Sequence, residues 1–323
     1  MVKYMRQPCP YTTVCVLVCI CFLLASCDNT DPASRLDMED RIDESAAGSL
    51  SDTPNTDQIL FGFDLRSSPQ EDAKQYLPLM KYLEAETGHR FMIRFTPSTS
   101  SIVDDLGNNV VQFAAVGAVS FLEADEKYGV KPLVRGLNLQ GKSEYQSMFV
   151  VLPGSPIRAF SDIRGKRLVF GNRSSTQGNL IPRIVLAEKG VGLDQLASYQ
   201  YTASHQDCAN TVLSGKADVC GMQDTMALSL ARKGLLRILH TSGYYPSSGI
   251  AVNREVSPEL IEKVRQALLD FKPQGEDKTD LYHWDKTEMP LGFKEAESRD
   301  YDQLKHWFKK LSPPEPPAVS KNK

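Results

Sequence analysis

Apolar runs of strand length alternate with helix-like segments through most of this chain of 323 residues. Ile59–Phe63 and Leu168–Phe170 are typical of buried strands, whereas Pro258–Phe271 repeats its apolar residues at the spacing of an amphipathic helix. With 41% hydrophobic and 24% charged residues, the chain can bury a full core. Strands that alternate with helices favour an α/β fold.

Two breaks divide this alternating pattern into three blocks. The first is Pro153-Gly154-Ser155-Pro156 and the second is Tyr245-Pro246. Each break has α/β pattern on both sides, so we expect two lobes joined by two crossings, the layout of a hinged clamshell that closes on a ligand. We assign residues 58–152 to the first lobe and 153–243 to the second lobe. Residues 244–310 are then the return to the first lobe and the C-terminal helices.

The N-terminal segment, residues 1–27, has the pattern of a lipoprotein signal peptide. A positive start with Lys3 and Arg6 precedes an apolar stretch that leads into Leu24-Ala25-Ser26-Cys27. This ending resembles the bacterial lipobox, which implies acylation of Cys27 and attachment to a membrane surface. A transmembrane helix is the alternative, but about a dozen apolar residues are too few to span about 30 Å of hydrocarbon. Asp28 resembles the signal that keeps some lipoproteins at the inner membrane.

The two ends of the remaining chain are polar. Residues 28–57 contain few apolar groups and are expected to form a flexible tether. Residues 311–323 include Ser312-Pro313-Pro314-Glu315-Pro316-Pro317 and are expected to be a disordered tail. The formal net charge is −3 and no basic run is present, which argues against nucleic acid as a partner.

Only two of the seven cysteines, Cys208 and Cys220, lie beyond Cys27. In an oxidising compartment they can form a disulfide, but two buried thiols fit the sequence equally well. No group of Cys and His has the spacing of metal ligands, so we expect neither a metal nor another cofactor.

A strand-to-helix turn at Gly171–Arg183 is the main candidate for ligand binding. It follows an apolar run and contains Ser175, Thr176 and Gly178 ahead of a helical segment. Hydroxyl groups, free backbone N–H groups and the positive end of a helix together form a seat for an anion. The alternative is an ordinary helix cap, since Ser and Thr are favoured at the start of any helix.

Five short motifs follow one another between residues 59 and 301. They are Tyr76-Leu77-Pro78-Leu79, Val116-Gly117-Ala118-Val119-Ser120-Phe121, Asp162-Ile163-Arg164-Gly165-Lys166-Arg167, Ser175-Thr176-Gln177-Gly178 and Ser204-His205-Gln206-Asp207. In this order and spacing they resemble the PhnD-like family of periplasmic solute-binding proteins for phosphonate, phosphite and phosphate. The resemblance implies a type 2 periplasmic-binding fold.

The resemblance also implies a site for a phosphorus oxyanion. Ser175 and Thr176 would supply hydroxyl donors, and the N–H groups of Thr176, Gln177 and Gly178 would complete a concave seat. His205 would donate to the same group, with a solvent-exposed loop histidine as the alternative. The family often has Ser at the position of Gln177, so this longer side chain implies a changed pocket.

Three more positions are assigned to the ligand site, Phe121 and Asp224 from the resemblance and Arg66 from its place in the chain. Phe121 stands where the family usually has Tyr, which implies the loss of one hydroxyl donor. Arg66 follows the first strand and can line the cleft, with a surface arginine as the alternative. Asp224 lies near the position where phosphonate binders carry an acidic residue for an amino group.

These assignments lead to two functional hypotheses. In the first, the protein is a monomeric, lipid-anchored solute-binding protein that captures a small phosphorus oxyanion and presents it to an ABC permease. In the second, the same clamshell senses the ligand and signals to a membrane kinase. We expect no enzyme, because the chain has no G-x-S-x-G, no H-E-x-x-H and no phosphate loop that ends in Gly-Lys-Ser/Thr.

Overall fold

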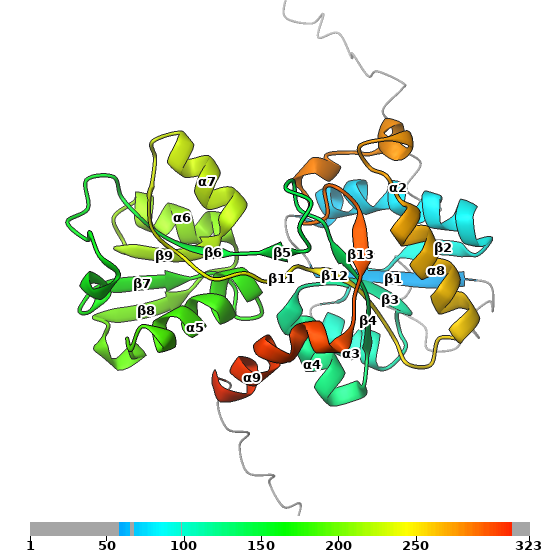
Figure 1. The fold of residues 1–323 in the computed structure, drawn as a ribbon, viewed down its shortest axis with the longest axis horizontal. Helices are drawn as coiled ribbons and strands as arrows, with labels where there is room; N and C mark the ends of the chain where they lie inside the picture. Colours follow the sequence, from blue (N-terminus) through cyan, green and yellow to red (C-terminus); the bar gives the residue numbers. More distant parts are fainter. Residues whose placement is uncertain (1–57, 65–67, 98, 312–323) are drawn as a thin grey trace, which may run out of the picture. The chain divides into compact units, whose positions relative to one another are not determined.

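The structure is a computed structural model that describes residues 58–64, 68–97 and 99–311. Two sheets with flanking helices form two lobes, which confirms the predicted α/β fold (Figure 1). The signal peptide with Cys27 and Asp28, the tether at 28–57 and Arg66 lie outside the described residues. The tail from residue 312 onward also lies outside them.

The first lobe is built on a six-stranded sheet in the order β13-β4-β12-β3-β1-β2. Its strands are Phe293–Glu295 (β13), Lys131–Gly136 (β4), Gly249–Val252 (β12), Phe113–Val116 (β3), Gln58–Phe63 (β1) and Arg90–Ile93 (β2). β1 is parallel to both β2 and β3, whereas β12 is antiparallel to β3 and β4. A β-carbon at Gly249 would lie 1.9 Å from the Val134 carbonyl oxygen, so the first residue of β12 has to be a glycine.

The second lobe is built on a five-stranded sheet in the order β10-β6-β9-β7-β8. Its strands are Arg237–Thr241 (β10), Ser147–Val151 (β6), Val219–Gln223 (β9), Arg167–Phe170 (β7) and Ser198–Tyr201 (β8). β7 is parallel to both β8 and β9, so the loops that follow these strands meet at one edge of the sheet.

The helices accompany the sheets in chain order. Those of the first lobe are Pro69–Thr87 (α2), Ile102–Gly107 (α3), Ala118–Tyr128 (α4), Pro258–Asp270 (α8) and Asp302–Leu311 (α9). Those of the second lobe are Ile181–Glu188 (α5), His205–Leu213 (α6) and Asp224–Arg232 (α7). Shorter helical turns include Phe160–Ile163, Leu193–Gln195, Glu276–Asp280, Trp284–Lys286 and Ser298–Tyr301. In the part of the chain that the structure describes, no helix has both the length and the apolar character needed to cross a membrane.

The ends of α2 show how local sequence fixes an element. Ser68 precedes the helix, and its hydroxyl accepts a hydrogen bond from the Glu71 N–H at 3.3 Å. Pro69 occupies the first turn, where its missing N–H costs nothing. The helix ends at Gly88, whose φ of 75° is the left-handed conformation that glycine adopts without strain.

Two short strands carry the chain between the lobes. Glu144–Tyr145 (β5) and Tyr245–Pro246 (β11) pair with each other in antiparallel register, as Figure 1 shows between the two sheets. The second crossing coincides with the predicted break at Tyr245-Pro246. The first crossing precedes the predicted boundary, because β6 already pairs in the sheet of the second lobe. Pro153-Gly154-Ser155-Pro156 is therefore a loop within the second lobe and not a crossing, and the assignment of residues up to 152 to the first lobe is wrong for β6.

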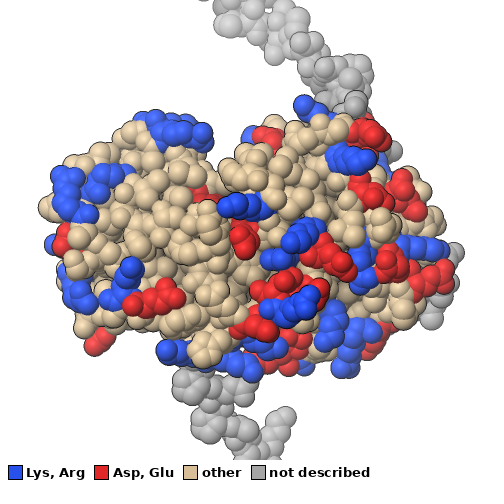
Figure 2. All heavy atoms as spheres, in the orientation of Figure 1, with Lys and Arg blue, Asp and Glu red and all other residues tan. Residues whose placement is uncertain are grey.

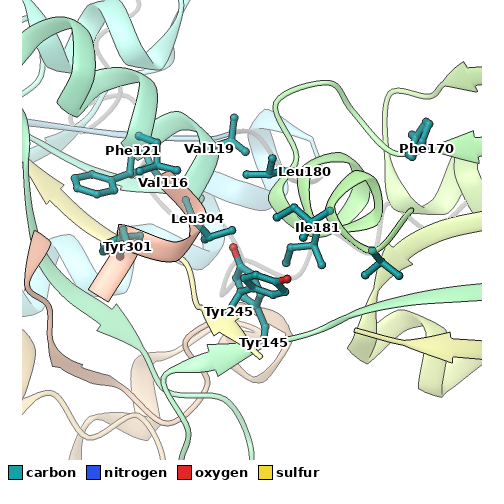
Figure 3. Packing of buried hydrophobic residues seen from close by; sticks show 14 of the residues in the cluster. Val116, Val119, Phe121, Tyr145, Phe170, Leu180, Ile181, Tyr245, Tyr301 and Leu304 are labelled. Atoms are coloured by element: carbon teal, nitrogen blue, oxygen red, sulfur yellow. The ribbon is translucent and has the colours of Figure 1, made fainter. Parts of the chain in front are cut away.

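One apolar cluster contains residues of both lobes. Leu180 and Ile181 from the second lobe belong to it together with Val119 and Leu304 from the first lobe (Figure 3). Burial of such side chains stabilises the fold by roughly 1.5–3 kcal/mol each. Partly buried Leu311, the last residue of α9, packs against this cluster, so it does not belong to the tail predicted for residues 311–323.

Cys208 and Cys220 form a disulfide, with a Cα–Cα distance of 5.8 Å. Both cysteines are fully buried in the second lobe, on α6 and β9 respectively. Of the two alternatives that the sequence left open, the structure therefore has the disulfide.

Charged side chains are mixed on the face of the molecule in Figure 2. Lysine and arginine lie among aspartate and glutamate, without a continuous basic surface on this face. One of the ion pairs joins Arg167 to Asp218, where the guanidinium donates to the carboxylate at 2.7 and 3.1 Å. This bidentate pair connects the start of β7 to the residue before β9.

Candidate functional site

A cavity of about 870 Å³ is lined by residues from both lobes. Asp64, Gly117 and Ser248 line it from the first lobe, and Thr176 and His205 line it from the second. Volumes of this order are typical of small-molecule sites. The cavity therefore lies where a ligand would contact both lobes at once.

The strand-to-helix turn predicted from the sequence forms one wall. β7 ends at Phe170, and a helical turn over Thr176–Leu180 (η4) leads directly into α5. Ser175 is the cap of this turn, and its Oγ accepts from the Gly178 N–H at 2.9 Å. The capping role that the sequence left as an alternative is therefore present. The Gly178 N–H is engaged by Ser175, contrary to the expectation that it faces a ligand.

Thr176 connects the turn to the other lobe. Its side chain is buried, and Oγ1 accepts from the Val119 N–H at 3.0 Å. Val119 lies in the first turn of α4, so this hydrogen bond joins the starts of two helices, one in each lobe. A hydroxyl has one donor and two acceptor positions. The Thr176 proton is not used in this bond and can be donated to a ligand oxygen in the cavity.

Gln177 lines the cavity, but its amide reaches into the second lobe. Nε2 donates to the Gln146 carbonyl oxygen at 2.7 Å and to Asp224 Oδ1 at 3.2 Å. Gln146 follows directly after the first crossing strand. The amide therefore links the candidate anion seat to this crossing.

Asp224 is held away from the cavity. It is not among the residues that line the cavity, and its carboxylate accepts from the Gln146 and Thr225 N–H groups at 3.1 and 2.7 Å in addition to Gln177. Burial raises the pKa of the Asp224 carboxyl, and these hydrogen bonds act in the opposite direction. The structure thus gives Asp224 a supporting role rather than direct access to a ligand.

His205 is the first residue of α6 and lines the cavity beside the turn that contains Ser175 and Thr176. Ser204 caps this helix, and its Oγ accepts from the Asp207 N–H at 3.1 Å. The ring lies close to Gly178, where a β-carbon would be 2.9 Å from His205 Cε1. Glycine at residue 178 therefore allows the imidazole to approach the turn.

Phe121 is not part of the cavity, contrary to the expectation. Its side chain is 3% exposed, and its ring packs against Tyr301 with a centroid distance of 4.5 Å (Figure 3). The neighbouring residue Ser120 has the polar role at this end of α4, since its Oγ donates to Asp64 Oδ1 at 3.0 Å. Consecutive residues of a helix point about 100° apart, which separates these two environments.

Asp64 is the site residue that the sequence analysis missed. It directly follows β1, and Oδ2 accepts from the Gly117 N–H at 2.8 Å at the start of α4. One feature of the sequence could have indicated this residue: Asp64 is a carboxylate that stands directly between a strand and the next helix. In a parallel pair such as β1 and β3 the residues after both strands lie at the same edge.

The described lining of the cavity contains more acidic than basic side chains. The carboxylates are Asp64, Glu71, Asp72 and Glu288, and the described basic side chain other than histidine is Lys286. His205 and His283 are the histidines among the described lining residues, which also include Tyr76 and Tyr145. An anion in this cavity therefore depends on local donors of the turn rather than on a general positive charge.

Residues 61–301 match the family model described as the periplasmic substrate-binding protein of an ABC transporter for phosphonate. This chain belongs to that family. The protein is therefore a periplasmic substrate-binding component of an ABC transporter and not an enzyme.

Curated relatives and solved structures agree with this assignment. A phosphonates-binding periplasmic protein from Escherichia coli is 25% identical over 231 residues, which cover 68% of each chain. The phosphate-import protein PhnD from Mycolicibacterium smegmatis is 24% identical over 254 residues, with 72% of this chain and 78% of the relative covered. PhnD1 from Prochlorococcus marinus in complex with methylphosphonate has a TM-score of 0.68 at 16% identity, covering 80% of this chain and 99% of that structure. The predicted type 2 periplasmic-binding fold is thereby confirmed.

Proposed function

We propose that this protein is a monomeric solute-binding protein, anchored through Cys27, that captures a phosphonate, phosphite or phosphate ion between its lobes for an ABC permease. The observation that carries this proposal is the position of Thr176. Its hydroxyl lines the cavity and simultaneously bonds the opposite lobe through the Val119 N–H.

The donors of the second lobe suit an oxyanion. The first N–H groups of a helix have no partner within it, so Thr176 and Gln177 can donate from the backbone. The Thr176 hydroxyl adds a side-chain donor, and the His205 imidazole lies on the same side of the cavity. Hydrogen bonds from such groups to a charged oxygen are about twice as strong as bonds between neutral groups.

The relatives support the chemical class of the ligand. The proteins named above bind phosphonate, import phosphate or hold methylphosphonate. At the same time, Gln177 covers Asp224, the acidic side chain that the sequence analysis assigned to a ligand amino group. We therefore propose that this chain takes a small oxyanion without an amino group, with methylphosphonate, phosphite and phosphate as the candidates.

Lipid attachment at Cys27 would hold the protein on the periplasmic face of a membrane, and Asp28 favours the inner membrane. The ligand-bound protein, with its two lobes closed, would be recognised either by a permease or by a sensor kinase. Deletion of the gene separates these alternatives: transport predicts loss of uptake of the radiolabelled ligand, whereas signalling to a kinase predicts that uptake continues while the ligand response is lost.

Calorimetric titration tests the binding function. The chain from Asp28 onward is refolded to remove bound ligand and titrated with methylphosphonate, phosphite, phosphate and 2-aminoethylphosphonate. We expect tight binding of at least one of the three ligands without an amino group. A folded protein that binds none of the four would contradict the proposal.

A further inference from the structure

Lys286 brings a positive charge to the cavity wall of the first lobe. It lines the cavity from this lobe, whereas Thr176 and His205 line it from the second. Its ammonium group forms no hydrogen bond or ion pair with any residue that the structure describes. An anion bound at the turn before α5 would therefore find one uncommitted cation on the other lobe.

The short turn that carries Lys286 is anchored in the first lobe. Trp284–Lys286 (η7) begins with a buried indole, whose Nε1 donates to the Met289 carbonyl oxygen at 2.8 Å. The indole also packs edge-on against Tyr76 of α2, with ring centroids 5.9 Å apart. Thr287 Oγ1 donates to the Trp284 carbonyl oxygen at 2.7 Å. Figure 1 shows this segment in orange, on the side of the first lobe that faces the second lobe. The lysine side chain therefore extends from a fixed backbone.

The residue before this turn is strained. His283 has a φ of 47° and a ψ of 32°, the left-handed conformation that is costly for any residue with a β-carbon. Its side chain also lines the cavity. Strained backbone persists where the surrounding structure fixes it, and it is concentrated at ligand sites. The strain at His283 therefore lies where the chain enters the part of the cavity wall that carries Lys286.

The other charges of this wall explain why a lysine is needed. Four carboxylates of the first lobe line the cavity and would repel a phosphonate or phosphate ion, namely Asp64, Glu71, Asp72 and Glu288. The hydroxyl and backbone donors of the turn at Thr176 are neutral. A lysine ammonium carries a full charge and three donors on a flexible stem, so it can bond ligand oxygens that the turn leaves exposed.

We infer that Lys286 is a ligand-binding residue that contacts the oxyanion from the first lobe and supplies its counter-charge. The ligand would then lie between the neutral donors of one lobe and the ammonium group of the other. This inference rests on the proposed function, since it takes the cavity to be the oxyanion site.

A charge series at Lys286 tests the contact. The chain from Asp28 onward is titrated calorimetrically with whichever of methylphosphonate, phosphite and phosphate wild type binds most tightly. Lys286→Gln should weaken binding about tenfold, because a charge-assisted hydrogen bond is lost. Lys286→Glu doubles the change in charge and should weaken binding about 100-fold. Lys286→Arg keeps the charge and should stay within about threefold of wild type.

Lys278→Gln is the matched control. Lys278 lies in the preceding helical turn, Glu276–Asp280, and is exposed like Lys286, but it does not line the cavity. Its ammonium group likewise has no partner among the described residues. This variant should keep the wild-type affinity. Salt should weaken the binding of wild type more than that of Lys286→Gln, because added ions screen the ammonium group.

The outcomes separate this inference from the proposed function. If Lys286→Gln binds within about twofold of wild type, Lys286 does not contact the ligand, and the oxyanion function stands. Equal weakening by Lys278→Gln also overturns the contact, since it indicates a general effect of charge. Failure of wild type to bind any of the three ligands overturns the proposed function and this inference together. Thermal unfolding of each variant checks that it is folded.

Discussion

The Val119 N–H donates to Thr176 Oγ1 at 3.0 Å, which directly connects the first turn of α4 in one lobe with the turn before α5 in the other. Both residues are buried, so the bond is shielded from competing water. A ligand that bonds to Thr176 therefore acts at a point where the two lobes already meet. This relationship makes Thr176 the most informative residue for mutation.

Thr176→Val should weaken binding of the oxyanion by about 1–3 kcal/mol, because it removes a donor to the ligand and the acceptor of the Val119 N–H. Thr176→Ser keeps the hydroxyl and should retain most of the affinity. Thr211→Val is the matched control, since this threonine donates to the Asp207 carbonyl oxygen on α6 and is not among the residues that line the cavity. Calorimetry measures the three affinities, and equal values for Thr176→Val and wild type would exclude this hydroxyl from the site.

Gln177→Ser should change which ligands bind. Loss of the amide removes the bonds to Asp224 and to the Gln146 carbonyl oxygen and opens a path from the cavity to the carboxylate. Affinity for 2-aminoethylphosphonate should rise at least about tenfold relative to methylphosphonate, since a hydrogen bond between charged groups contributes about 1.5–3 kcal/mol. Gln206→Ser, at a cavity-lining glutamine that donates to Asn210, should leave the ratio unchanged. If the affinity for 2-aminoethylphosphonate relative to methylphosphonate is the same in both variants, Gln177 does not block access of the ligand to Asp224.

The disulfide between Cys208 and Cys220 should stabilise the second lobe. It closes a loop with a sequence separation of 12, for which chain entropy predicts about 2–3 kcal/mol of unfolding free energy. Replacement of both cysteines by alanine should lower stability by this amount in denaturant titrations. Reductant should lower the stability of wild type but not of the double variant. If the denaturant midpoint of wild type is the same with and without reductant, the disulfide does not contribute to the free energy of unfolding.

Asp104 provides a pH-dependent contribution in the first lobe. The hydrogen bond from Lys127 Nζ at 2.7 Å, followed by those from Tyr128 and Ser101, lowers the pKa of the Asp104 carboxyl to about 2. A lowered pKa in the folded state stabilises the protein above the unfolded pKa of about 3.9, and this stability is lost as the pH falls toward about 2. The carboxylate is partly exposed, so the effect is small. Thermal unfolding of wild type and Asp104→Asn should differ most above about pH 4 and converge near about pH 2. A difference that grows on acidification would contradict this account.

The fold was predictable because its signals are local. Strand-length apolar runs between helical segments indicated α/β, and the motif around Ser175 correctly indicated a turn between a strand and a helix. The first crossing was misplaced because Glu144–Tyr145 is a very short strand and lacks a compositional signal. Pro153-Gly154 gave a stronger signal, but it marks a loop inside the second lobe.

The site was predictable in part. Ser175, Thr176, Gln177 and His205 all line one cavity, as the family motifs implied. Sequence could not show that Gln177 bonds to Asp224, because this contact joins residues 47 positions apart and depends on the packing of η4 against β9. The role of Asp64 was hidden for the same reason, since its partners Gly117 and Ser120 follow it at sequence separations of 53 and 56.

The most direct measurement of the central claim is a crystal structure of the complex with methylphosphonate. The account predicts the phosphonate group in the cavity between the lobes. One oxygen should lie about 2.7 Å from Thr176 Oγ1, and others should lie about 2.9 Å from the N–H groups of Thr176 and Gln177. A phosphonate group bound elsewhere, or bound in the cavity without contact to the turn from Ser175 to Gly178, would contradict the account.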